Sequence, residues 1–424
     1  MTKRVLIITY YWPPTGGSGV QRWVKFAKYL PQMGWQPVIY TPENPERLAV
    51  DESLLKEIPS CVEVLKTRIW EPYSLYRKLF RGGTEVNPVN SIKGGWKKRL
   101  AGWIRGNCFV PDPRVGWVKP SVRYLRKYLE EHPVDTIVTT GPPHSMHLIG
   151  RELHRQTGIR WIADFRDPWT EIFYFKHLTL SKRSERKHRC LEQSVLDEAD
   201  AIVSVSPPVQ DDFRKKTDTP VHLVTNGYDA CDFPDTRDTS ENRFFTVVHT
   251  GLFASDGNPL FLWDELARKC MKDPEFREKL RIRLIGKTDR QILDAVYDRR
   301  MGDNLENPGY LSHTETVRQQ RSAGVLILPL RQEPEYGKVL PGKIFEYLAA
   351  RRPVLGIGQK NGAAAWILKD CRAGEMLEWD DREGIRRFIE REWENFLSGK
   401  RERLTSDIQQ YERRNLTKRL TEIL

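Results

Sequence analysis

Residues 5–12 read Val-Leu-Ile-Ile-Thr-Tyr-Tyr-Trp, and residues 13–19 read Pro-Pro-Thr-Gly-Gly-Ser-Gly. The first run is continuously apolar and rich in β-branched residues, as expected of a strand buried on both faces of a parallel sheet. The second run breaks that strand, and a helical pattern follows it at Val20, Trp23, Val24, Ala27 and Leu30. Residues 37–41, Pro-Val-Ile-Tyr-Thr, supply the next strand, so this end of the chain predicts a βαβ unit.

The same alternation of strand and helix continues along the chain. Short strands are predicted at residues 136–140, 160–163 and 201–205, and after a turn-rich segment at residues 225–242 they resume at residues 244–249, 281–285, 324–328 and 353–357. From about residue 380 onward the pattern is helical. The chain therefore belongs to the α/β class and predicts two Rossmann-like domains in tandem, divided near residue 225.

Composition and charge narrow the class of protein. Of the 424 residues, 39% are hydrophobic and 30% charged, which excludes a disordered or fibrous chain. The formal charge is +12, and residues 1–225 hold 35 Lys and Arg against 24 Asp and Glu, whereas the remainder holds 34 against 33. We therefore expect an anionic partner for the first half. Six scattered Cys and no apolar run near the ~18 residues of a membrane span predict a cytoplasmic protein with reduced thiols.

Two segments have the pattern of phosphate-binding sites. Gly16 and Gly17 lie between the first strand and a helix, where backbone N–H groups favour phosphate, although a tight turn explains them equally well. Residues 340–349 read Leu-Pro-Gly-Lys-Ile-Phe-Glu-Tyr-Leu-Ala. Pro341 suits a first helical position, so Gly342 and Lys343 would present N–H groups and a cation to a diphosphate. Glu346 would accept hydrogen bonds from sugar or ribose hydroxyls, or would be a carboxylate favoured by the helix dipole.

Three residues of the first half follow predicted strands at the end where open α/β sheets bind ligands. His144 comes after residues 136–140, and we weigh contact with a substrate against a loop histidine packed on Pro142 and Pro143. Asp164 and Arg166 follow residues 160–163. We favour an active-site role for both, and a buried structural Asp–Arg pair is the alternative.

In their order and separation, several segments resemble the family 4 retaining glycosyltransferases of the GT-B fold. The matching segments are residues 10–22, 141–144, 164–169, 192–206, 226–229, 309–310, 341–348 and 352–354. The resemblance implies two Rossmann-like domains that face each other across a cleft. Residues 1–225 would bind the acceptor, residues 226–400 the nucleotide sugar, and residues 401–424 would form a helix that packs back on the first domain. The implied reaction moves a sugar from a nucleotide-diphosphate donor to a hydroxyl with retained configuration.

The resemblance also implies roles for single residues. Glu346 matches the second Glu of the Glu-x7-Glu motif, which binds the donor ribose, but Lys338 stands at the position of the first Glu. Tyr310 and Leu311 would flank the base, and a histidine near His144 contacts the sugar in relatives. Many relatives have a basic pair after the strand that ends near Gly251, and this chain has none there. We therefore expect Lys343, Lys338 and the loop at Gly16 and Gly17 to meet the phosphate charge.

No two aspartates are spaced i, i+2, so the D-x-D motif of metal-dependent transferases is absent from the sequence. We expect metal-independent transfer with no cofactor besides the donor substrate. His144 and His147 are three residues apart, but further ligands for a metal are not evident.

Residues 93–105 hold five cations and no acid, and Trp96, Leu100, Trp103 and Ile104 recur at helical spacing. This is the pattern of a basic interfacial helix, and a solvated helix with its aromatic residues in the core is the alternative. A membrane helix in an acceptor domain would suit a lipid-linked acceptor. We therefore expect a peripheral enzyme at the inner face of the cell membrane, acting in bacterial surface polysaccharide or glycolipid assembly.

Two other functions fit parts of the sequence. GT-B folds also serve nucleotide-sugar epimerases, and Lys338 in place of a motif Glu leaves that function open. A basic scaffold that binds membrane or nucleic acid would explain the charge of the first half. Because no nucleic-acid recognition motif is present, we expect no nucleic-acid partner.

Overall fold

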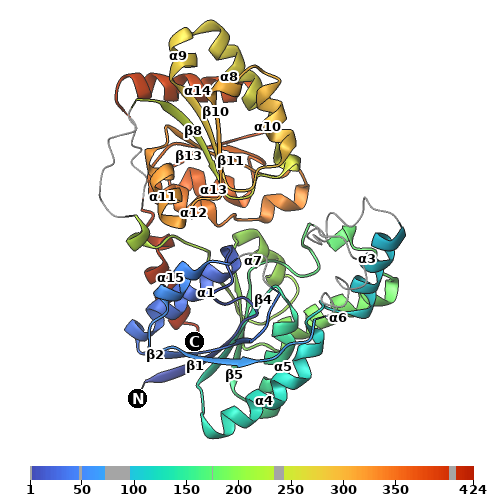
Figure 1. Cartoon of the computed structure of the whole chain (residues 1–424). Helices are drawn as coiled ribbons and strands as arrows, with labels where there is room; N and C mark the ends of the chain where they lie inside the picture. Colours follow the sequence, from blue (N-terminus) through green and yellow to red (C-terminus); the bar gives the residue numbers. More distant parts are fainter. Residues whose placement is uncertain (1, 47–49, 72–95, 174, 234–242, 401–406) are drawn as a thin grey trace. The chain divides into compact units, whose positions relative to one another are not determined.

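The computed structural model describes residues 2–46, 50–71, 96–173, 175–233, 243–400 and 407–424 (Figure 1). The chain divides into two compact units, of which the first contains Met1–Thr225 with Arg414–Leu424 and the second contains Asn226–Arg413. No helix among the described residues combines the length and the apolar character that a membrane crossing requires.

A parallel sheet is the centre of the first unit. In the described residues it has seven strands in the order β3-β2-β1-β4-β5-β6-β7. Ile7 in β1 pairs with Ile39 on one side and with Val138 on the other, so both edges of this central strand are covered. The strands are β1 (Lys3–Ile8), β2 (Trp35–Pro42), β3 (Glu63–Thr67), β4 (Thr136–Gly141), β5 (Arg160–Phe165), β6 (Ala201–Ser204) and β7 (Val221–Leu223).

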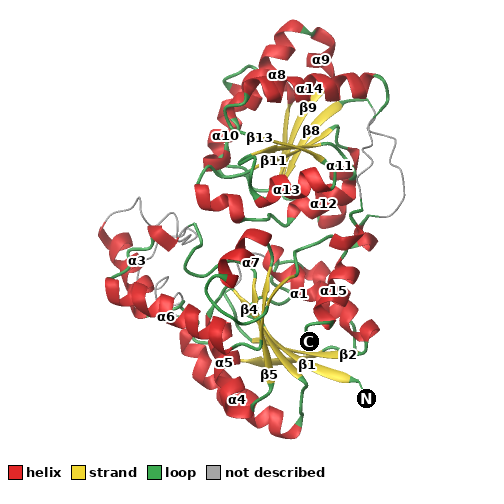
Figure 2. Ribbon diagram, turned by 180° about the vertical axis from the view of Figure 1, so that it is seen from behind, coloured by secondary structure: helices red, strands yellow, loops and turns green. Residues whose placement is uncertain are grey.

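Helices cover both faces of this sheet (Figure 1, Figure 2). One face is packed by α4 (Val118–Glu131), α5 (Ser145–Thr157), α6 (Lys182–Glu198) and α7 (Pro207–Arg214), and the other by α1 (Ser18–Tyr29) and α15 (Arg413–Thr421). A further helix among the described residues of this unit is α3 (Trp96–Cys108). Leu416 and Leu420 of α15 are buried with Trp23 of α1, and the Thr136 hydroxyl donates to the Leu424 carbonyl oxygen at 2.9 Å. The last helix of the chain therefore completes the core of the first unit.

The second unit repeats the architecture. Its described residues form a parallel sheet of six strands in the order β10-β9-β8-β11-β12-β13. The strands are β8 (Phe245–Thr250), β9 (Leu280–Ile285), β10 (Leu305–Gly309), β11 (Val325–Pro329), β12 (Val354–Ile357) and β13 (Gly374–Leu377). The helices are α8 (Leu260–Lys272), α9 (Pro274–Lys279), α10 (Arg290–Tyr297), α11 (His313–Ser322), α12 (Lys343–Ala350), α13 (Ala363–Asp370) and α14 (Arg382–Leu397). Two apolar clusters, one on each face, form its core.

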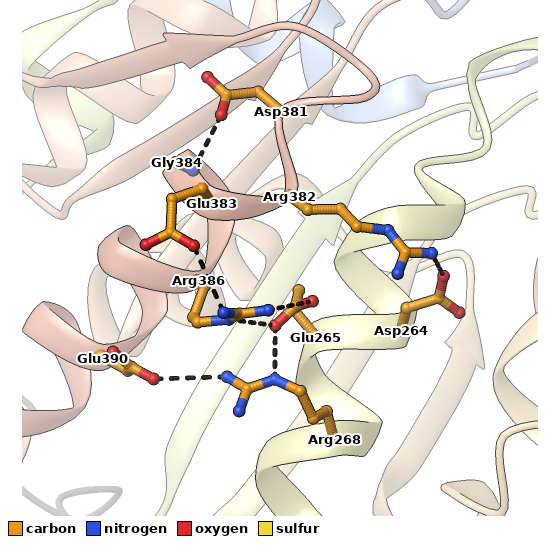
Figure 3. A network of polar contacts seen from close by, with 9 residues as sticks. All are labelled: Asp264, Glu265, Arg268, Asp381, Arg382, Glu383, Gly384, Arg386 and Glu390. Atoms are coloured by element: carbon orange, nitrogen blue, oxygen red, sulfur yellow. Dashed lines mark hydrogen bonds and ion pairs between the residues drawn. The ribbon is translucent and has the colours of Figure 1, made fainter.

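A network of charged side chains joins α8 to α14 on one face of the second unit (Figure 3). At its centre the buried Glu265 accepts hydrogen bonds from Arg268 at 2.7 Å and from Arg386 at 2.9 Å. A second link between the helices is the ion pair of Arg382 with Asp264 at 2.9 Å. The two guanidinium groups surround a carboxylate that burial alone would destabilise, so the network fixes the position of α14 over α8.

The predicted fold class is confirmed, because both units are parallel α/β layers. The predicted first strand was too long, since β1 ends at Ile8 and residues 9–12 lie in the following loop. Four strands were not predicted, namely β3, β7, β10 and β13. The second unit ends at Arg413 rather than at residue 400, because Ile408 and Tyr411 are buried in its core.

Candidate active site

The carboxyl end of β8 is the centre of the candidate site in the second unit. β8 ends with His249 and Thr250, and Gly251 follows with φ +92°. That left-handed backbone conformation favours glycine, and it turns the chain directly after the strand. The end of an open parallel sheet is where α/β proteins bind their ligands.

Lys343, the first residue of α12, brings a cation to this turn. Its Nζ lies 3.2 Å from His249 Nε2 and 3.5 Å from the Leu252 carbonyl oxygen. A Cβ added to Gly251 would lie 3.4 Å from the same Nζ, so the glycine leaves the amine room. Burial lowers the pKa of the Lys343 amine to about 8, although Glu346 raises it. The loop after β8 contains no basic residue, and Lys343 of α12 supplies a cation beside it.

Glu346 lies one turn further along α12 and is held by α11. Its Oε2 accepts a hydrogen bond from Gln320 Nε2 at 2.8 Å, and its Oε1 lies 3.5 Å from His313 Nε2. Burial raises the pKa of the Glu346 carboxyl, but the hydrogen bonds from His313 and Gln320 outweigh it, so the net shift is downward. Glu346 is therefore an ionised, oriented carboxylate.

The same network reaches β8. Gln320 Nε2 also donates to Thr250 Oγ1 at 3.1 Å, and the Thr250 backbone N–H donates to the Tyr347 hydroxyl at 3.1 Å. Both Gln320 and Tyr347 are fully buried. These buried hydrogen bonds fix α11 and α12 against the end of β8.

The other predicted residues of this unit lie on neighbouring loops. Pro341 and Gly342 precede α12, and Gly342 is its N-cap. Lys338 ends a short 3-10 turn in the loop after β11. Tyr310 follows β10 and is 79% exposed, whereas Leu311 next to it packs against the core. The contacts described above join Gly251, Lys343 and Glu346, and the roles of the remaining residues stay predictions.

In the first unit, Asp164 forms a fully buried ion pair. Its two oxygens accept from Arg22 at 2.8 and 3.2 Å, and Oδ2 also accepts from Trp23 at 2.9 Å and Thr140 at 2.8 Å. Both charged side chains are 1% exposed. Burial raises the pKa of the carboxyl, but Arg22 and these hydrogen bonds bring it below its usual range. These contacts favour the structural alternative, with Arg22 rather than Arg166 as the partner.

Arg166 connects the start of α1 with the loop that follows β4. Its guanidinium donates to the Gly19 carbonyl oxygen at 3.0 Å and to that of Pro142. A Cβ at position 19 would collide with this guanidinium, which explains the glycine there. Gly17 is the N-cap of α1 with φ +112°, and Gly16 precedes it. Arg166 therefore holds the first turn of α1, which directly follows the predicted phosphate loop.

His144 is the N-cap of α5 and is 7% exposed. Its ring stacks on Trp169 with a centroid distance of 4.6 Å. Burial, with smaller effects from His147 and Arg166, lowers the pKa of His144 well below its usual value. His144 is thus a neutral imidazole at the end of β4, where its role in sugar contact stays a prediction.

His147 is fully buried beside His144, and its Nδ1 contacts Thr139 Oγ1 at 2.9 Å. Burial lowers the pKa of His147 to about 3. Among the described residues, no group of three or more His, Cys, Asp or Glu is arranged to hold a metal ion.

Sequence reasoning did not identify His249, His313 or Gln320 as site residues. His249 could have been found from its place at the carboxyl end of a predicted strand, as Asp164 was. His313 and Gln320 give no such signal, because they lie in a polar helix without a motif.

Two parallel α/β units in tandem are the architecture of the GT-B class of glycosyltransferases. A family model described as the glycosyl transferase 4-like domain matches residues 16–227. The chain belongs to this family. The predicted resemblance to family 4 GT-B glycosyltransferases is thereby confirmed.

Solved structures share the fold over the full chain. Sucrose-phosphate synthase from Thermosynechococcus elongatus matches with a TM-score of 0.65 and 14% identity, over 99% of this chain and 98% of that one. A trehalose-6-phosphate structure from E. coli, bound with UDP-2-fluoro glucose, matches with a TM-score of 0.59 and 12% identity over 99% and 98%.

A putative UDP-N-acetylglucosamine 2-epimerase from Listeria monocytogenes matches with a TM-score of 0.59 and 10% identity, over 99% of this chain and 95% of that one. At these identities the likeness shows the fold alone. No curated protein sequence matches the chain.

Proposed function

We propose that the protein is a retaining, metal-independent hexosyltransferase that moves a sugar from a nucleotide-diphosphate donor to a hydroxyl acceptor. The observation that supports this best is the Lys343 amine beside Gly251, with the ionised Glu346 one turn further along the same helix. A cation and a carboxylate in that order suit a diphosphate and the ribose next to it. The solved E. coli structure of the same fold is bound with a UDP-sugar analogue, which supports a nucleotide-sugar donor.

In this proposal the anomeric carbon exchanges one oxygen for another on the same face. The bond to the diphosphate oxygen breaks, the bond to the acceptor oxygen forms, and the departing phosphate oxygen takes the acceptor's proton. Lys343 stabilises the negative charge that develops on the diphosphate, while Glu346 accepts hydrogen bonds from the ribose hydroxyls. Tyr310 and Leu311 flank the base, and Lys338 adds charge near the phosphates. His144 contacts the sugar, and the loop at Gly16 and Gly17 offers N–H groups to anionic oxygens.

A donor panel tests the proposed function. The protein is incubated with UDP-, GDP- and ADP-hexoses in a chelator, and the release of nucleoside diphosphate is measured. We expect one donor to be consumed without divalent metal, with retained configuration in the product. Interconversion of the sugar within the nucleotide would instead identify an epimerase, and strict dependence on added Mg²⁺ or Mn²⁺ would contradict the metal-independent mechanism.

We further propose that the acceptor is lipid-linked and that the first unit approaches an anionic membrane, as in surface polysaccharide or glycolipid assembly. Most of the predicted basic segment, residues 93–101, lies outside the residues whose side chains the structure describes. At the end of α3, however, Trp103 is 45% exposed and Ile104 is 41% exposed. Asn107, in the last turn of α3, contacts the start of α6. Its side-chain oxygen accepts a hydrogen bond from the backbone N–H of Ser181, the N-cap of α6, at 2.7 Å. Several exposed cations follow there, namely Lys182, Arg183, Arg186 and Lys187.

Vesicle sedimentation tests this partner. We expect the protein to bind vesicles that contain phosphatidylglycerol and not pure phosphatidylcholine, because each cation near an anionic surface adds about 1 kcal/mol. Trp103→Glu removes an aromatic anchor and should weaken binding by about 10- to 100-fold, given roughly 1.5–3 kcal/mol for a buried large side chain. Trp366, 49% exposed in the second unit, provides the matched control, and Trp366→Glu should bind like the natural chain. Equal loss in both variants would contradict docking through α3.

A further inference from the structure

The proposed mechanism leaves the histidine at the end of β8 without a role. His249 is 1% exposed. Its Nδ1 lies 3.3 Å from the Ile327 carbonyl oxygen on β11, and its ring centroid lies 4.2 Å from that of Phe253. These contacts hold the ring in one orientation, in which Nε2 lies 3.2 Å from Lys343 Nζ.

The partners of the ring determine where its proton lies. Each ring nitrogen faces a carbonyl oxygen, Nδ1 that of Ile327 at 3.3 Å and Nε2 that of Leu252 at 3.4 Å. Nε2 also lies 3.2 Å from the Lys343 ammonium, which only donates, so Nδ1 holds the proton of the neutral imidazole. Nε2 then has a free lone pair and accepts a hydrogen bond from the Lys343 ammonium. Burial, followed by the charge of Lys343, lowers the pKa of His249 well below its usual value, so a second proton is excluded near neutral pH.

We propose that His249 is a positioning residue for Lys343. Its Nε2 and the Leu252 carbonyl oxygen together accept from the lysine ammonium and hold that cation beside Gly251. The loop after β8 has no Lys or Arg at residues 250–257, so the cation beside Gly251 comes from α12. Its contacts with His249 of β8 and with Leu252 hold it there. That this cation binds a diphosphate rests on the proposed function. That its position depends on His249 does not.

The charged and titratable groups around the amine are few among the described residues. His249 faces it from β8, and Glu346 lies on its own helix and favours its charged form. His313 acts from α11 through Glu346, and Tyr347 is bonded to Thr250. Loss of the Nε2 acceptor removes a group that stabilises the Lys343 ammonium, while the amine stays buried. We therefore expect the pKa of Lys343 to fall further when His249 is replaced by an apolar ring.

Competitive labelling measures that pKa without any substrate. The folded protein is acetylated with a trace of acetic anhydride over a series of neutral to alkaline pH values, and mass spectrometry quantifies the peptide that contains Lys343. We expect an apparent pKa of about 8 for Lys343 in the natural chain. His249→Phe should lower the pKa by about one unit, and His249→Gln, whose amide oxygen still accepts, should leave it near the natural value. Lys279, in α9, serves as the internal control and should label identically in all three proteins.

Either variant alone can overturn the proposal. A folded His249→Phe protein in which Lys343 titrates as in the natural chain would show that the histidine does not act on the amine. Should His249→Phe fail to fold, a folded His249→Gln protein with a Lys343 pKa displaced by a unit or more would overturn it equally. Circular dichroism establishes which proteins are folded.

Nucleotide binding gives the second measurement, with UDP and GDP as probes in calorimetry. The amine is protonated below its pKa, so affinity should fall as the pH rises through that value, and in His249→Phe the fall should begin at lower pH. Above both pKa values the variant should bind up to about tenfold more weakly for each unit of pKa lost, and well below them it should bind like the natural chain. A loss of equal size at every pH would indicate mere structural damage and overturn the proposal. A shifted Lys343 pKa with no binding of either nucleotide would uphold His249 as the positioning residue and reject the proposed donor.

Discussion

Replacing Lys343 by Met is expected to reduce sugar transfer by about 10²–10³-fold, the usual effect of losing one preorganised group that stabilises developing charge. The loss should appear in kcat, because the charge on the diphosphate grows as the glycosidic bond breaks. Lys343 lies beside Gly251, and residues 250–257 themselves contain no Lys or Arg. Initial rates over a range of donor concentrations, with the donor identified by the panel, measure the effect.

The pH dependence of kcat/KM provides a second test of the role of the Lys343 amine. Burial lowers the pKa of Lys343 to about 8, so the protonated form is lost as the pH rises through that value and kcat/KM should fall there. Lys343→Arg keeps the charge at every accessible pH and should abolish this alkaline fall, although the longer guanidinium will not reproduce the full rate. Lys279→Met, in an exposed helix pair with Glu275, controls for loss of surface charge. A Lys343→Met protein within a few-fold of the natural rate would remove Lys343 from the mechanism.

The interior strands of both sheets could be predicted from the sequence, and the edge strands could not. Each predicted strand corresponds to a strand flanked by neighbours on both sides, whereas β3, β7, β10 and β13, which were not predicted, are the four edge strands. Interior strands of a parallel sheet are covered on both faces and are continuously apolar. Edge strands such as β3, Glu-Val-Leu-Lys-Thr, and β10, Leu-Glu-Asn-Pro-Gly, are half exposed and polar, so no apolar run marks them.

The candidate site shows a similar division. Lys343 and Glu346 could be predicted because a Pro-Gly-Lys helix start and a carboxylate one turn later form a local pattern. His249, Gln320 and Thr250 act through contacts between β8, α11 and α12, which lie far apart in the sequence. For Asp164 the local pattern left two alternatives open. Its place after a buried strand is typical of a ligand group, but the partner that buries it, Arg22, lies 142 positions away.

The largest effect on stability is expected from breaking the buried pair of Asp164 and Arg22. Removal of one partner leaves the other charge buried without compensation, which typically costs about 3–5 kcal/mol. Arg22 also donates to the carbonyl oxygens of Val224 and Thr225, each at 2.8 Å, at the end of the first unit. Asp164→Ala and Arg22→Met should therefore each lower the free energy of unfolding of the first unit by about that amount.

A double-mutant cycle separates the pair from general damage. Because the double variant buries neither charge, its loss should be clearly smaller than the sum of the two single losses. The exposed pair of Arg155 and Glu198, at 2.6 Å in the same unit, is the matched control, and Glu198→Gln should cost less than about 1 kcal/mol. Urea unfolding with hydrogen exchange of peptides from β4 and β5 assigns the change to the first unit. Strictly additive losses would contradict a coupled pair.

The same pair should make the first unit sensitive to acid. The pKa of Asp164 is lower in the folded unit than its ordinary value, because Arg22 and the hydrogen bonds outweigh the opposing effect of burial. A carboxyl with a depressed folded pKa stabilises the fold above its unfolded pKa of about 3.9, and this contribution is lost as the pH falls toward the folded pKa. The natural chain should therefore lose more stability between neutral pH and this acid range than Asp164→Ala does. If Asp164 acted only in catalysis, Asp164→Asn would abolish transfer and leave the free energy of unfolding unchanged. The buried pair predicts instead that Asp164→Asn lowers the free energy of unfolding of the first unit.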